Sequence, residues 1–134
     1  MVRKPKDVTD AELAVLQALW DRGPSTTRQL TDLLYPDGPA SQSATVLKLL
    51  ERLEQKQCVR RERPGGANVF SAVVRREDLI ERRLQAVAES LCEGSRTPLL
   101  MHLVDPERLT REERDTLRAL VDELDAKNHK KKKP

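Results

Sequence analysis

The chain has 134 residues, of which 37% are hydrophobic, 2% aromatic and 35% charged. That length allows one ordinary domain, or a small domain with an accessory element, and the few aromatic side chains predict a helical core of Leu and Val. No apolar run approaches the ~18 residues of a membrane span, and no apolar stretch follows the basic start. We therefore predict a cytoplasmic protein without a transmembrane helix or a secretory signal.

The net charge of +3 conceals an uneven distribution of charged residues. Residues 1–76 contain 13 Lys and Arg against 9 Asp and Glu, and residues 77–126 contain 7 against 13. Residues 127–134 contain five lysines and no acidic residue. This distribution predicts a division of labour in which only the first and last parts suit a polyanion.

The first predicted element is a capped helix. Thr9 and Glu12 match a capping box, and the apolar residues that follow supply one face of a helix that ends near Arg22. Gly23-Pro24 ends the helix. Trp20 at its end could stack on a ligand, but a Trp packed in the core is far more common there.

A short second helix is predicted at 27–35, followed by a turn at 36–39 and a third helix at 41–56, with Ser41 as its N-cap. Apolar residues at i, i+3, i+4 and i+7 form one stripe of the third helix. They are Val46, Leu49, Leu50 and Leu53. This order of helices and turn is typical of a helix-turn-helix.

The front of the third helix is short, polar and mildly cationic, so it can enter the major groove of DNA. The residues predicted to contact DNA there are Gln42, Ser43, Ala44, Thr45, Lys48 and Arg52. Lys48 can donate to guanine, and Gln42 can pair with adenine. An ordinary amphipathic helix with a solvated front is the alternative interpretation, and only the neighbouring elements decide between the two.

Two strands are predicted at 58–63 and 68–74, with a turn at 64–67. Helices that end in a basic hairpin predict a winged helix, here over residues 1–76. Arg60, Arg61 and Arg63 of the first strand are predicted to reach phosphates or an adjacent minor groove. Edge-strand arginines that only prevent aggregation are the alternative, but the preceding helix-turn-helix favours DNA.

Residues 77–126 predict three more helices, at 77–92, at 97–104 and after a second capping box formed by Thr110 and Glu113. A segment this short cannot bury three apolar stripes by itself, so we predict a helical dimerisation region completed by a second copy. Packing of these helices back onto the winged helix is the alternative. The predicted dimerisation residues are Ile80, Leu84, Val87, Leu91, Leu99, Leu100, Leu103, Leu117, Leu120, Val121 and Leu124.

The lysine-rich tail at 127–134 is predicted to be disordered. The two histidines and two cysteines show no HxxxH or CxxC spacing, and free thiols are favoured over a disulfide between Cys58 and Cys92. Dinucleotide-binding, P-loop and catalytic-triad patterns are absent from the sequence. We therefore predict no enzyme activity, no metal ion, no cofactor and no small-molecule substrate.

From Thr9 to about Asp125 the chain resembles the BlaI/MecI/CopY family of penicillinase, methicillin-resistance and copper-responsive repressors. The most specific match is Thr9-Asp-Ala-Glu-Leu-Ala-Val-Leu-Gln-Ala-Leu-Trp20, followed by Thr45-Val46 with Leu50-Glu-Arg-Leu53, and by Val69-Phe70 in the wing. The resemblance implies an N-terminal winged helix, a C-terminal helical dimerisation region and a homodimer on a palindromic operator in double-stranded DNA.

In characterised members of that family, repression of β-lactamase-type genes ends when a membrane sensor's signal triggers cleavage of the repressor. The resemblance therefore implies a membrane sensor-protease pathway as a further partner. Members cleaved in this way have an Asn-Phe bond where this chain has His102-Leu103, and copper-responsive members have a cysteine motif where it has lysines. Ala72-Val73-Val74 replaces the Tyr-x-Pro that commonly closes the wing. The target genes and the inducing signal do not carry over.

Two hypotheses of different classes follow. The chain is either a dimeric, operator-binding repressor, or a winged-helix module that uses its helix face for a protein partner and binds no specific DNA. The basic wing and the basic first part favour the repressor.

Overall fold

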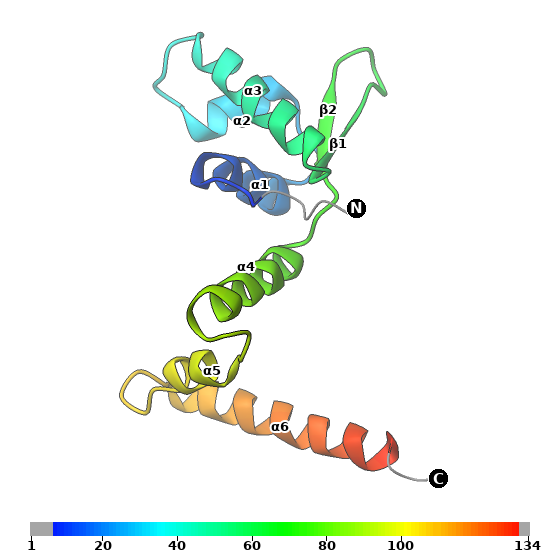
Figure 1. The fold of residues 1–134 in the computed structure, drawn as a ribbon. Helices are drawn as coiled ribbons and strands as arrows, with labels where there is room; N and C mark the ends of the chain where they lie inside the picture. The colour runs from blue at the N-terminus through cyan, green and yellow to red at the C-terminus, as the bar shows by residue number, and fades with distance from the viewer. Residues whose placement is uncertain (1–6, 132–134) are drawn as a thin grey trace. The chain divides into compact units, whose positions relative to one another are not determined.

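The computed structural model describes residues 7–131, with side chains described to residue 128 (Figure 1). The elements in chain order are α1 (Asp10–Arg22), α2 (Thr27–Leu34), α3 (Gln42–Gln55), β1 (Val59–Glu62), β2 (Val69–Ala72), α4 (Arg76–Leu91), α5 (Thr97–Leu103) and α6 (Arg111–Lys131). They form two compact units, the first ending at Leu84 and the second beginning at Gln85. Within the described residues, no helix has the length and apolarity needed to cross a membrane.

The core of the first unit lies between α1, α2, α3 and the hairpin. Leu16, Leu50, Leu53 and Phe70 are completely buried there. The apolar stripe predicted for α3 is buried in full, because residues spaced by three and four share one face of a helix. The predicted mainly helical winged helix with a β-hairpin is therefore confirmed.

Capping boxes start both α1 and α2. Thr9 Oγ1 accepts from the backbone of Glu12 at 3.2 Å, and the Glu12 carboxylate accepts from Thr9 N at 3.3 Å, as the sequence predicts. Thr26 and Gln29 form the same reciprocal pair at α2, where the sequence analysis predicted a helix start but no box. Each box satisfies two backbone groups that a helix end otherwise leaves unpaired.

Ser41 is the N-cap residue of α3, as predicted, but its side chain does not cap the helix. Ser41 has helical dihedral angles, φ −61° and ψ −20°, and its side chain makes no capping hydrogen bond. Instead, Ser43 N donates to Ala40 O at 3.1 Å and Ala44 N donates to Ser41 O at 3.2 Å. These tight i to i+3 bonds already occupy the amides that a capping side chain would accept from.

β1 and β2 form an antiparallel pair in which Val59 faces Ala72 and Arg61 faces Phe70. Both strands are shorter than predicted. Ser25, in the α1–α2 connection, adds an isolated bridge: its N–H donates to Phe70 O at 3.0 Å, and Phe70 N–H donates back to Ser25 O at 2.8 Å. The hairpin is therefore hydrogen-bonded to the helical part of the unit at the residue that also fills its core.

Trp20 joins α1 to the start of α4. The ring is half-buried against the core, and its Nε1 donates to Val74 O at 2.9 Å. The guanidinium of Arg76 lies 5.1 Å from the ring centroid. Leu79, one turn into α4, is buried in the same core. The first unit thus extends beyond residue 76, the predicted end of the winged helix, to Leu84.

The second unit contains the rest of α4, α5 and α6. The capping box predicted for α6 is present, with Thr110 Oγ1 accepting from Glu113 N at 3.1 Å. The helix continues to Lys131, so it includes the first part of the tail that was predicted to be disordered, while residues 132–134 lie outside the described range. Among the described residues of this unit only Ala88 is buried, and the other apolar side chains are exposed or half-buried.

Candidate nucleic-acid interface

The outer face of α3 is polar because its inner face is used for the core. Ala44, Thr45, Lys48 and Arg52 are exposed, whereas Gln42 and Ser43 in the first turn are half-buried. The exposed residues follow each other at helical spacing, opposite the buried stripe. The structure therefore brings the residues predicted on α3 to one face or to its N-terminal edge.

Lys48 and Arg52 form no ion pair within the described part of the chain, so their charges are not neutralised locally. An ammonium or guanidinium group donates to the O6 and N7 acceptors of guanine, and Thr45 offers a hydroxyl and a methyl group. Glu51 is exposed on the same helix and can accept from cytosine N4. This chemistry suits the edges of base pairs.

The wing presents two of its three predicted arginines to solvent. Arg60 is 66% exposed and pairs with Glu62 at 3.1 Å, while Arg63 Nε donates to the side chain of Asn68 at 2.8 Å. Both contacts are local to the hairpin, and exposed pairs of this kind contribute little to stability. Arg60 and Arg63 are therefore free to exchange these partners for a phosphate.

Arg61 is placed differently from its neighbours. Its Nη2 lies 3.2 Å from the Glu54 carboxylate on α3, and its guanidinium carbon lies 4.9 Å from the centroid of the Phe70 ring. Arg61 thus contacts both α3 and β2, and the structure does not group it with the exposed cations of the wing.

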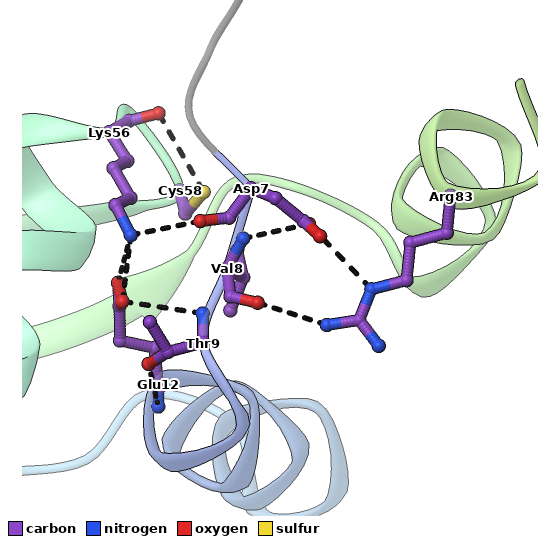
Figure 2. Close-up of polar contacts among 7 residues, drawn as sticks. All are labelled: Asp7, Val8, Thr9, Glu12, Lys56, Cys58 and Arg83. Carbon is purple, nitrogen blue, oxygen red and sulfur yellow. Dashed lines mark hydrogen bonds and ion pairs between the residues drawn. The ribbon is translucent and has the colours of Figure 1, made fainter. Parts of the chain in front are cut away.

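A polar cluster that was not predicted from the sequence lies at the end of α3 (Figure 2). Lys56 Nζ donates to both oxygens of Glu12, at 2.7 and 2.8 Å, and to the backbone oxygen of Asp7 at 3.0 Å. From α4, Arg83 Nη2 donates to Val8 O at 3.0 Å. The cluster joins the residues before α1 to the end of α3 and to the middle of α4.

Glu12 is the buried member of this cluster, with 1% of its surface exposed. Burial by itself raises the pKa of its carboxyl group, but the hydrogen bonds from Lys56 and Thr9 outweigh burial, so the pKa lies below its ordinary value. A capping-box glutamate is usually solvated. The only sign in the sequence that Glu12 is buried was the nearness of the apolar residues Leu13 and Val15.

Cys58 and Cys92 are both free thiols. Burial raises the pKa of the Cys58 thiol, which therefore stays protonated near neutral pH. Among the described side chains, no group of three His, Cys, Asp or Glu residues is arranged to hold a metal ion.

The residues predicted for dimerisation form the apolar surface of the second unit and of the adjoining part of α4. Eight of the eleven are exposed, among them Leu91 at 79% and Leu103 at 67%, and Leu84, Leu99 and Leu117 are half-buried. Shallow apolar hollows flank α6 on the side of Leu117, and Val104 and Leu109 line both of them.

A winged helix with a polar, cationic outer helix face and a basic wing is the architecture of a DNA-binding transcriptional regulator. The family model described as penicillinase repressor matches residues 8–123. The chain therefore belongs to the penicillinase repressor family, as the resemblance in its sequence indicated. It is a DNA-binding transcriptional repressor and not an enzyme.

Two named relatives are similar to this chain over most of its length. The transcriptional regulator BlaI of Mycobacterium tuberculosis is 34% identical over 119 residues, which is 87% of this chain and 84% of that protein. The penicillinase repressor of Bacillus licheniformis is 23% identical over 130 residues, 97% of this chain and 99% of that protein. Among solved structures, the transcriptional regulator Tm0710 from Thermotoga maritima is similar with a TM-score of 0.48 and 23% identity, covering 95% of this chain and 80% of that one.

Proposed function

We propose that the protein represses transcription as a homodimer that binds a palindromic operator, with α3 of each copy in the major groove. The observation that carries this proposal is the division of α3 into a fully buried stripe and an exposed face with Thr45, Lys48 and Arg52. A helix held by one face against a core and polar on the other presents its side chains in fixed positions to base edges.

The apolar surface of the second unit supports a second copy as the partner. On α6, the apolar stripe is symmetric in its spacing. The outer pair, Leu117 and Leu124, and the inner pair, Leu120 and Val121, are centred on the same point of the helix. Two α6 helices running antiparallel would therefore match Leu117 with Leu124 and Leu120 with Val121 of the other copy. Self-complementary patches of this kind are what a two-fold symmetric interface requires.

We infer target genes of the β-lactamase type or other stress-response genes, and the name of the penicillinase repressor of Bacillus licheniformis supports the first of these. A signal that loosens the second unit would release DNA without changing the reading face of α3, since two linked half-site contacts bind far more tightly than one. A membrane sensor-protease pathway is one such signal. His102-Leu103, exposed at the end of α5, stands where cleaved members have their Asn-Phe bond, so the signal for this chain need not be cleavage at that point.

Selection of bound duplexes from genomic fragments tests the proposal, because it gives both the binding activity and the target genes. We expect recovered fragments to share a palindromic sequence and to bind with an affinity that falls steeply with salt. Recovery of fragments without a common sequence, or no salt-dependent shift, would instead support a winged-helix module that binds a protein partner.

A further inference from the structure

Arg61 lies on a strand of the exposed wing, but its side chain faces the protein. Alternate residues of a strand point to opposite sides, and on β1 Val59 is buried and Arg61 half-buried, whereas Arg60 and Glu62 are exposed. Arg61 therefore shares the inner side of β1 with Val59. Its cross-strand partner is Phe70, whose side chain is completely buried.

The guanidinium of Arg61 is held by two elements at once. It lies over the Phe70 ring, 4.9 Å from the centroid, and donates to Glu54 of α3 at 3.2 Å. Its Nε is buried and has no hydrogen-bond partner among the described residues. Two of the three guanidinium nitrogens are therefore poorly placed to bind a phosphate, because Nε is buried and Nη2 is paired with Glu54. A planar guanidinium can stack and form an ion pair together, which an ammonium group does less well.

Both anchors of Arg61 are themselves fixed. Phe70 fills the core and exchanges two backbone hydrogen bonds with Ser25, at 2.8 and 3.0 Å. Glu54 follows Leu53, a fully buried residue of α3, directly in sequence. Because Arg61 contacts both anchors, it fixes the position of the wing relative to the exposed face of α3.

We propose that Arg61 is a positioning residue for DNA binding: through Phe70 and Glu54 it holds the wing at a fixed place beside α3. This inference rests on the proposed binding of an operator by α3. Base contacts by α3 and phosphate contacts by the wing can form together only if their separation matches one duplex. A wing that is already held in place loses less conformational entropy on binding, which strengthens the complex.

Replacement of Glu54 separates this role from a direct phosphate contact. If Arg61 instead contacts a phosphate directly, Glu54→Gln should strengthen DNA binding, because it removes an acidic charge near the DNA. If Arg61 positions the wing, Glu54→Gln and Arg61→Gln should each weaken operator binding by roughly tenfold, and the double variant should be no weaker than either single one. The slope of log affinity against log salt should be unchanged in all three, because no phosphate contact is lost.

The pair Arg60 and Glu62 on the outer side of the same strand is the matched control. These side chains are 66% and 59% exposed and lie 3.1 Å apart, and no hydrogen bond or ion pair joins them to α3 among the described residues. Glu62→Gln should leave operator binding unchanged or stronger. Arg60→Gln should weaken binding to all duplexes alike and lower the salt slope by about one unit.

Backbone amide exchange of β1 and β2 without DNA provides a measurement that needs no operator. We expect Arg61→Gln and Glu54→Gln to speed exchange in the hairpin, Arg61→Lys to restore part of the protection, and Arg60→Gln to leave it unchanged. Equal exchange in the Arg60 and Arg61 variants, or tighter operator binding by Glu54→Gln with a reduced slope for Arg61→Gln, would overturn the proposal. If the parent protein shows no operator preference, the proposed function fails, while the exchange rates still decide the role of Arg61.

Discussion

At the scale of single residues, the ion pair of buried Glu12 with Lys56 is a polar contact whose loss should lower stability measurably. Glu12 serves two roles, because it caps α1 through Thr9 and neutralises the Lys56 ammonium that follows α3. Removing one member of a buried pair leaves the other uncompensated. The partial exposure of Lys56, 17% of its side chain, and its bond to Asp7 O moderate that loss.

Glu12→Gln should lower the free energy of unfolding by about 1–3 kcal/mol at pH 7, even though glutamine keeps the capping box. Because the folded-state pKa of Glu12 is lowered, its stabilisation is present above the ordinary Glu pKa of about 4.3 and disappears as the pH falls through the folded-state value. Urea unfolding of both proteins between pH 7 and pH 3 measures this.

Glu113→Gln is the control, since Glu113 holds the same capping-box position on α6 with no ion pair among the described residues. It should change stability less than Glu12→Gln does. A difference between wild type and Glu12→Gln that stays constant down to pH 3 would contradict the proposed role of the Glu12 charge.

At the scale of elements, α3 and the wing are expected to make different kinds of contact. The double variant Thr45→Ala and Lys48→Ala should lose about 1–3 kcal/mol for each base contact removed and should accept more bases at the matching operator positions. Titration of operators with single base-pair changes measures this. Gln55→Ala, an exposed change at the other end of α3, should bind like wild type. Unaltered preference in the double variant would show that α3 does not read bases.

Arg63 at the end of the wing strand should contact phosphate only. Arg63→Ala should weaken binding to the operator and to a random duplex to the same extent. The slope of log affinity against log salt should fall by about one unit, because one phosphate contact is lost. Among the described residues its only hydrogen bond is to Asn68, so Asn68→Ala, which frees the guanidinium, should not weaken binding. A loss confined to the operator would indicate that Arg63 reads bases.

Periodicity predicted the elements well because helical and strand spacing are local properties. The stripe of α3 and the box of Thr9 and Glu12 could be read directly from the sequence. The burial of Glu12, the inward turn of Arg61 and the bridge from Ser25 depend on residues distant in sequence, so the local pattern did not reveal them. The failure of Ser41 as a cap has the same origin, since the preceding turn already satisfies the amides.

At the scale of the whole molecule, two linked winged helices are expected to bind far more tightly than one. A fragment of residues 1–84 keeps Leu79 and Arg83, which complete the first unit, and should stay folded and monomeric. It should bind operator at least ~100-fold more weakly than the full chain, because the second half-site contact is no longer intramolecular. Light scattering beside operator titrations measures both properties, and circular dichroism verifies the fold. A monomeric full-length chain would refute the proposed dimer.

The most direct measurement titrates the full-length chain against a selected operator and against the same duplex with one half-site scrambled, at one salt concentration. A homodimer that reads both half-sites through α3 should bind the intact operator as two chains per duplex and lose at least ~100-fold in affinity when one half-site is scrambled. Equal affinity for the two duplexes, or one chain bound per intact operator, would contradict it.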